Sequence, residues 1–175
     1  MIRTEQPIDA DAIHAVTAAA FRGADYAAAD VDGDPGEAAL VGWLRADSSW
    51  IPELSLVAEL DGVVVGHLVA TRGYVGESPA LGLGPVSVHP DQQRRGFGSA
   101  LVNELLARAD KMGETLVALL GDPDYYERFG FRESTWFGVQ PPVDDYGKHF
   151  QALTLAAHDP AMVGRFRYAA PFDRL

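Results

Sequence analysis

The pattern of hydrophobic and polar positions predicts a meander of three antiparallel strands near the middle of the chain. Two apolar stretches, residues 54–60 and 63–74, flank Asp61-Gly62, a pair that supplies the positive φ required by a two-residue turn. After a short loop, residues 81–89 form a third run of strand-favouring residues. Because short turns join these strands, each is expected to pair with the next in antiparallel order.

Before the meander, the sequence predicts an edge strand over residues 1–6 and two helices. The first helix is capped by Asp9 and ends at Gly23, since its apolar residues recur on one face, and the second covers residues 37–46. Residues 24–36 between the helices hold four aspartates together with glycine and proline. We therefore expect a mobile loop there.

After the meander, residues 98–111 form a helix whose broad apolar face is suited to packing on the sheet. Residues 115–120 are almost continuously apolar and predict a buried strand, parallel to the strand at 81–89 because a helix connects the two. We then expect a short helix, a strand, a proline-bearing acidic loop, a last strand and a docked aromatic tail, over residues 124–129, 131–137, 139–149, 150–156 and 157–175.

The order of these elements, β-α-α-β-β-β-α-β-α-β-β, predicts a mixed α/β (α+β) fold. Its sheet is mixed but mainly antiparallel, with about six to seven strands and helices on both faces. The 175 residues show no internal repeat or composition break, so we expect a single domain over residues 1–175. The pattern alone does not distinguish this order from other α/β folds.

The composition excludes several classes of protein. The chain has no cysteine, which rules out a disulfide framework, thiolate zinc sites and cysteine catalysis. Its histidines are scattered without ligand spacing, so we expect no metal site. The N-terminal segment lacks the apolar core of a signal peptide, and no apolar run approaches membrane-spanning length. We therefore expect a soluble, cytoplasmic protein with no membrane partner.

The net charge of −11, from 14 Lys and Arg against 25 Asp and Glu, argues against nucleic acid as a partner, because an acidic surface repels phosphates. The same charge favours solubility and would also steer cationic substrates toward the protein. A polyanionic ligand would need a local binding site, and the basic pair Arg94-Arg95 marks the obvious one.

An anion site is predicted where the third strand of the meander meets the following helix. A glycine-bearing loop from Gln93 to Gly98 precedes that helix, and the first turn of a helix leaves N–H groups unpaired and partly positive. A tight turn without a ligand is the simpler alternative. A dinucleotide fingerprint needs a small residue where Leu101 stands, and the Gly-Lys-Ser/Thr of a nucleoside triphosphate loop does not occur.

Two adjacent runs, Val86-Ser87-Val88-His89-Pro90 and Gln93-Arg94-Arg95-Gly96-Phe97-Gly98, resemble the strand and acetyl-CoA loop of the GNAT superfamily of N-acetyltransferases. The resemblance is specific over residues 81–131, the expected CoA-binding core. It implies the GNAT sheet and acetyl-CoA as cosubstrate. The residues that it implies for acetyl-CoA binding are Val86, Ser87, Val88, Arg94, Arg95, Gly96, Phe97, Gly98 and Ser99.

A second motif, Tyr125-Tyr126-Glu127-Arg128-Phe129-Gly130-Phe131, resembles the aromatic-Tyr-x-x-x-Gly-Phe of many GNAT members. With the preceding Gly-Asp-Pro, it is similar to a bacterial subgroup of predicted acetyltransferases. The register implies that Tyr126 is the general acid for the CoA sulfur, since a phenol with a pKa of about 10 is protonated at neutral pH. The alternative is that Tyr126 only packs beside the cosubstrate. The family also implies that the backbone N–H of Val88 binds the thioester carbonyl and its oxyanion.

The resemblance implies an acetyl-CoA-dependent N-acetyltransferase in which a primary amine attacks directly within a ternary complex. A CoA- or acyl-CoA-binding sensor with little turnover is the alternative, because residues 121–124 lack an asparagine that many members carry there. No general base is assigned: Glu59, His67 and His89 are candidates, and water is another route for the proton. The acceptor, a small molecule or a protein, and a possible homodimer stay open.

Overall fold

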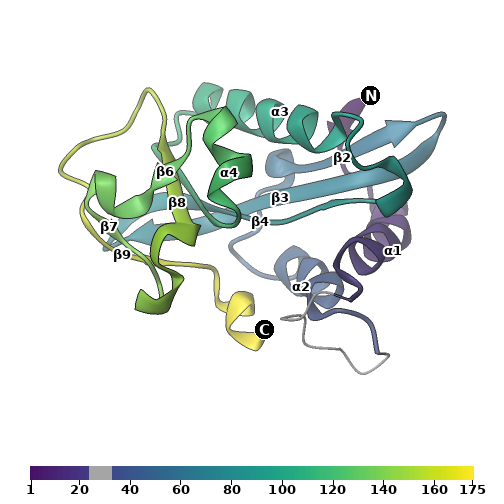
Figure 1. Cartoon of the computed structure of the whole chain (residues 1–175), viewed down its shortest axis with the longest axis horizontal. Helices are drawn as coiled ribbons and strands as arrows, with labels where there is room; N and C mark the ends of the chain where they lie inside the picture. The colour runs from purple at the N-terminus through teal and green to yellow at the C-terminus, as the bar shows by residue number, and fades with distance from the viewer. Residues whose placement is uncertain (24–32) are drawn as a thin grey trace.

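The computed structural model describes residues 1–23 and 33–175 of the chain (Figure 1). Most of the loop expected over residues 24–36 lies outside these residues. The described strands form one sheet in the order β1-β2-β3-β4-β5-β8-β6, with β9 paired to β3 and β7 paired to β9. These strands are β1 Ile2–Thr4, β2 Ser55–Leu60, β3 Val63–Val75, β4 Ser78–Val88, β5 Leu116–Leu120, β6 Arg132–Glu133, β7 Val139–Gln140, β8 Phe150–Thr154 and β9 Gly164–Arg167.

The pairing confirms a mixed, mainly antiparallel sheet. Among the described strands, β4 with β5 and β7 with β9 pair in parallel, and the other pairs are antiparallel. The Asp61-Gly62 turn has positive φ at both residues, 50° and 79°, as the hairpin between β2 and β3 requires. The sheet has more strands than the sequence predicted, because β6, β7 and β9 are only two to four residues long.

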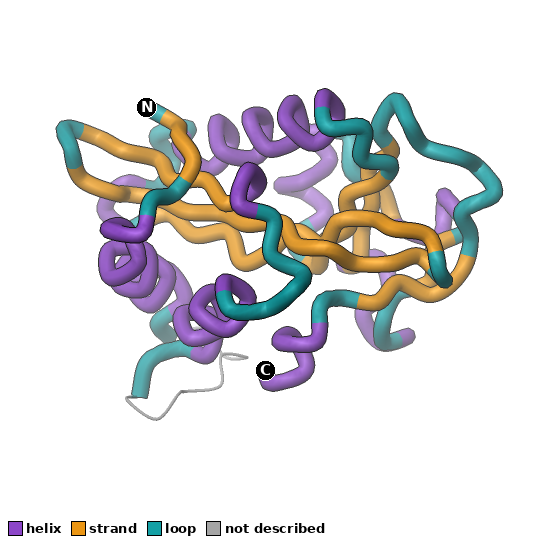
Figure 2. The backbone as a smooth tube through the Cα atoms, turned by 180° about the vertical axis from the view of Figure 1, so that it is seen from behind, coloured by secondary structure: helices purple, strands orange, loops and turns teal. Residues whose placement is uncertain are grey.

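Helices cover both faces of the sheet, as Figures 1 and 2 show. The helices are α1 Ala10–Phe21, α2 Gly36–Arg45, α3 Phe97–Lys111 and the short α4 Pro123–Tyr126. Neighbouring strand residues point to opposite faces. Leu68 of β3 therefore packs in a core with Leu105 of α3, whereas Val69 packs in another core with Leu40 of α2. Hence α3 lies on one face, and α1 and α2 lie on the other.

The structure corrects the expectations for the C-terminal third. The strand expected over 131–137 is confined to β6, and residues Ser134–Phe137 form a 3-10 turn that ends at Gly138, where φ is 72°. Burial there does not alternate: Arg132 and Glu133 are both exposed, whereas Ser134 is buried. The loop expected over 139–149 contains β7 and a 3-10 segment, Asp144–His149. Residues 157–175 contain β9 and a last 3-10 segment, Ala170–Arg174, which lies against α2.

The central strands β4 and β5 separate toward one end of the sheet. They pair only at Leu81 with Val117 and at Gly82 with Ala118, although β4 continues to Val88. The register between β3 and β4 also shifts between Leu68 and Ala70, so β4 carries an extra residue there. Such a bulge bends a strand away from its neighbour. The second half of β4 therefore has one edge without a partner strand.

Candidate active site

The backbone of β4 directs the amide of Val88 into the gap between β4 and β5. The next residue, His89, donates its backbone N–H to the carbonyl of Val65 on β3 over 2.8 Å. Along a strand, successive amides point to opposite edges. The N–H and carbonyl of Val88 therefore face away from β3, and the side chain of Gln93 donates to this carbonyl over 3.2 Å.

The glycine-bearing loop ends in a helix start with unpaired amides. Gly96 caps α3 with φ of 88°, and Arg94 also has positive φ, 60°. Within the described residues, no backbone N–H from 94 to 99 donates to another residue of the chain, and the first turn of α3 holds no acidic side chain. The structure starts this helix at Phe97, one residue before the predicted start. These N–H groups and the dipole of a 15-residue helix suit an anion.

The loop and the second tyrosine motif meet at Gly98. A Cβ added to Gly98 would lie 3.0 Å from the hydroxyl of Tyr125 and 3.7 Å from Cγ2 of Val88. The guanidinium of Arg128 lies over the ring of Tyr125, 4.3 Å from its centroid. Tyr125 thus packs α4 against the start of α3, and this approach favours a small residue at position 98.

Tyr126 is held by aromatic and glycine contacts on the α3 face of the sheet. Its ring packs edge-on to Tyr125, with centroids 4.9 Å apart, and to Phe131 at 5.8 Å. A Cβ on Gly121 would lie only 2.6 Å from the Tyr126 ring, so Gly121 admits the ring. Asp122 begins α4 by accepting from the backbone N–H of Asp124 over 3.0 Å. The short α4 therefore fixes this phenol at the wall of the cleft.

A cleft of about 1600 Å³ runs through the gap between the separating strands. On the side of β4 and α4, its walls include Val86, Val88, Gln93 and Tyr126. From the opposite layer, α1, α2 and the C-terminal segment contribute Phe21, Glu37, Leu40, Phe172 and Asp173. The structure thus brings Val88 of β4 and the predicted phenol of Tyr126 to one cavity that is also lined by α1 and α2.

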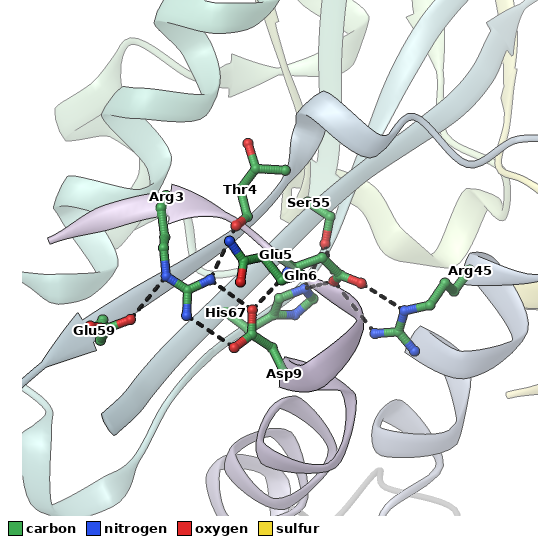
Figure 3. Close-up of polar contacts among 9 residues, drawn as sticks. All are labelled: Arg3, Thr4, Glu5, Gln6, Asp9, Arg45, Ser55, Glu59 and His67. Carbon is green, nitrogen blue, oxygen red and sulfur yellow. Dashed lines mark hydrogen bonds and ion pairs between the residues drawn. The ribbon is translucent and has the colours of Figure 1, made fainter. Parts of the chain in front are cut away.

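The three side chains considered as general bases lie outside the described walls of this cleft. His67 is completely buried and lies 2.9 Å from Ser55 Oγ and 3.3 Å from Glu5 (Figure 3). Burial lowers the pKa of His67 below its usual value. Glu59 accepts from Arg3 over 2.9 Å, and His89 accepts from the amide of Asp91 over 3.3 Å. None of the three is therefore placed to remove a proton from an acceptor in the cleft.

The network around His67 joins β1, β2, β3 and α2. Glu5 binds Arg45 of α2 over 2.7 Å and also the hydroxyl of Ser55 (Figure 3). Burial alone raises the pKa of Glu5, but the hydrogen bonds from His67, Arg45 and Ser55 outweigh it and hold this pKa at about 2. The carboxylate is charged at neutral pH, and its role here is to tie the first strand to the helix layer.

Comparison with known proteins identifies the family. The model of the acetyltransferase (GNAT) family matches residues 21–131. A protein of Escherichia coli K12, the uncharacterized N-acetyltransferase YjhQ, is 33% identical over 143 residues, which cover 77% of this chain and 79% of that protein.

The chain belongs to the GNAT family.

Two solved GNAT structures resemble this chain over almost its whole length. A GNAT acetyltransferase from Brucella melitensis, solved with acetyl-CoA, is 38% identical with a TM-score of 0.78, covering 99% of this chain and 97% of the other. YhbS from Escherichia coli, solved with CoA, is 30% identical with a TM-score of 0.87, covering 100% and 92%. The similarity in fold therefore extends beyond residue 131, into the region where the sequence was least informative.

Two features of this GNAT cleft were missed by sequence reasoning. Glu37 lines it with 9% of its surface exposed, and only its placement on α2 shows that it faces a cavity. Tyr168 also lines it, stacked on Phe172 with centroids 4.4 Å apart, and burial raises the pKa of Tyr168. The aromatic residues of the tail were the only sequence signal for the second feature.

The described residues contain neither a cluster of metal ligands nor a membrane-spanning helix. Across residues 1–23 and 33–175, no three His, Asp or Glu side chains gather closely enough to hold a metal ion. In the same residues, no helix combines the length and apolar character needed to cross a bilayer.

Proposed function

We propose that this protein is an acetyl-CoA-dependent N-acetyltransferase in which a primary amine attacks the thioester directly within a ternary complex. GNAT membership and the relatives solved with acetyl-CoA and CoA support this function. The observation that carries the residue assignment is the edge of β4. The Val88 amide faces the gap between β4 and β5, and Tyr126 lines the same cleft. Gly98, at the start of α3, lies against the side chain of Val88 and the hydroxyl of Tyr125.

Acetyl-CoA would bind along this edge. Its diphosphate accepts hydrogen bonds from the N–H groups of residues 94–99, with the exposed side chains of Arg94 and Arg95 adding positive charge in an otherwise acidic protein. Its pantetheine arm lies beside Val86, Ser87 and Val88 as an added strand would, because this edge of β4 lacks a strand partner. Gln93, bound to the Val88 carbonyl, holds the loop against the strand.

The transfer then needs three groups at the thioester. The neutral amine nitrogen attacks the acetyl carbon, and the Val88 N–H donates to the oxygen that becomes an oxyanion. When the C–S bond breaks, the thiolate takes a proton from the hydroxyl of Tyr126. The proton lost by the amine leaves through water in the open cleft, because His67, Glu59 and His89 are engaged elsewhere. Solvent then restores the phenol.

The alternative, a CoA-binding sensor with little turnover, rests on the missing asparagine in residues 121–124, and no contact in the described residues adds to it. We further propose that the enzyme works in the cytoplasm on an amine of a small molecule or a protein, without a nucleic-acid or membrane partner. The net charge of −11 supports the exclusion of nucleic acid.

Replacing one hydroxyl tests the assignment of the acid. Tyr126→Phe is expected to lower kcat for acetyl transfer about 100-fold, because general acid catalysis contributes that much, while the Kd for CoA is unchanged. Thiol release and the acetylated amine, the latter by mass spectrometry, are measured over a panel of amines. Tyr125→Phe is the matched control, since it removes a hydroxyl that abuts Gly98 and does not line the cleft, and it is expected to keep the wild-type kcat. Equal kcat in Tyr126→Phe and the wild type would remove Tyr126 from the mechanism.

A further inference from the structure

Glu37 presents a buried carboxylate without a partner at the α2 side of the cleft. It lies in the first turn of α2, on the face of the sheet opposite α3, and lines the cleft. Only 9% of Glu37 is exposed, and its Oε2 atom is buried and accepts no hydrogen bond. No ion pair or hydrogen bond to this side chain is formed by any residue in the described part of the chain.

The position of Glu37 at the start of α2 does not explain why its carboxylate is buried without a hydrogen-bond partner. A carboxylate at a helix N-terminus gains a modest interaction with the helix dipole. Burying a charged group without a partner costs more than that interaction returns. Buried polar groups are paired in the great majority of cases, so an unpaired carboxylate in a cavity wall points to a ligand that completes it.

Charge near Glu37 favours a cation as that ligand. Asp47 and Asp173 line the same wall, and Ser49, whose amide donates to Asp47 over 2.9 Å, holds the pKa of Asp47 below its usual range. Asp47 follows α2 by two residues and Asp173 belongs to the C-terminal 3-10 segment, and these two elements pack on each other. Arg174 of that segment lies over the ring of Trp43, 5.0 Å from its centroid, and its positive charge also contributes to lowering the pKa of Asp47.

Each of the three arginines that line the cleft contacts a group other than Glu37. Arg72 binds both carboxylate oxygens of Glu114, over 2.8 and 2.6 Å. Arg165 donates to Asp144 over 3.0 Å. Arg167 donates to a backbone carbonyl over 3.1 Å and lies over the ring of Tyr74, 5.3 Å from its centroid. Among the described residues that line the cleft, Glu37 is the one with a buried carboxylate oxygen that accepts no hydrogen bond.

We propose that Glu37 binds a second, non-reacting ammonium group of the acceptor, so that the enzyme prefers aliphatic diamines and polyamines. The proposal rests on the proposed function and names its substrate class. The reacting amine approaches the Val88 amide, and the distal ammonium fills the place beside Glu37. Phe21, Leu40 and Phe172 give this part of the cleft apolar walls for the methylene chain between the two nitrogens.

Paired substrates of equal length test this assignment. Cadaverine carries an ammonium at its far end, whereas pentylamine ends in a methyl group. Wild-type kcat/KM is expected to be at least about tenfold higher for cadaverine, since a desolvated charge pair contributes at least that much to recognition. Glu37→Gln is expected to remove the difference by raising the KM for cadaverine, with the KM for acetyl-CoA and the rate on pentylamine unchanged. Glu53→Gln removes an exposed charge outside the cleft and keeps the preference.

Binding gives an independent readout. Calorimetric titration of cadaverine into the CoA complex is expected to show a Kd raised about tenfold by Glu37→Gln and unchanged by Glu53→Gln. Equal Kd values for wild type and Glu37→Gln, or equal kcat/KM for the two amines, would overturn the proposal. Acetylation of both amines without discrimination leaves the N-acetyltransferase function standing. Absence of acetyl transfer to every amine, with cadaverine bound through Glu37, would instead contradict the proposed function alone.

Discussion

At the scale of single residues, contacts at Gly98 explain why small side chains are needed where the two motifs meet. Gly98 lies between the hydroxyl of Tyr125 and the side chain of Val88. Gly96 is required for a different reason: the space around it is open, but its φ of 88° disfavours other residues. Gly98 thus makes room for Tyr125. Gly96 allows the turn that leads into α3 and leaves the first backbone amides of this helix exposed.

This contact yields a prediction for CoA binding. Gly98→Glu is expected to raise the Kd for CoA at least about 100-fold, because it adds a bulky negative charge beside the amides proposed to hold the diphosphate. Calorimetric titration with CoA measures the change, and far-UV circular dichroism checks the fold. Asn103→Glu adds the same charge to an exposed position further along α3 and is expected to bind CoA nearly as the wild type does. A Gly98→Glu variant with wild-type affinity would place the diphosphate away from this loop.

At the scale of elements, two features have different roles: β4 separates from β5, and β1 is attached to α2. The first leaves one edge of β4 unpaired and thereby creates the cleft. The second holds the N-terminal strand to α2 through Glu5 and Arg45, at a distance of 2.7 Å (Figure 3). The buried His67, a candidate base when only the sequence is considered, belongs to the network that attaches β1 to α2.

The depressed pKa of Glu5 predicts a pH-dependent contribution to stability. Its folded pKa is about 2 against a usual 4.5, so the stabilisation is present above about pH 4.5 and is lost as the pH falls toward 2. Glu5→Gln is expected to lower the free energy of unfolding by about 2 kcal/mol at neutral pH, with partial solvent screening included.

Urea denaturation from pH 7 to pH 3 measures this difference. The gap between wild type and Glu5→Gln should narrow as the pH falls, whereas Glu77→Gln, at an exposed position, should match the wild type throughout. A gap that stays constant across this range would show that the ionised form of Glu5 does not carry the stabilisation.

At the scale of the whole molecule, local chemistry predicted the elements that build the cleft. The Asp61-Gly62 turn, the apolar face of α3 and the continuous apolar run of β5 each depend on neighbouring residues, and all are confirmed. Strands β6, β7 and β9 were not predicted at their observed bounds, because strands of two to four residues exist only through long-range pairing.

Of the site residues, too, only those in a continuous stretch of sequence could be predicted. The loop over residues 93–98 is continuous in sequence and was recognisable from its glycines and arginines. Glu37 was not recognisable, because its burial depends on α2 facing β4 and the C-terminal segment across the molecule. Only the assembled fold shows that this acid lacks a partner.

A crystal structure of this protein with acetyl-CoA tests the central claim most directly. We predict the diphosphate on the backbone N–H groups of residues 94–99, the thioester oxygen on the Val88 N–H, and the sulfur beside the Tyr126 hydroxyl. Acetyl-CoA bound away from the β4–β5 gap, or a sulfur out of reach of Tyr126, would contradict the account.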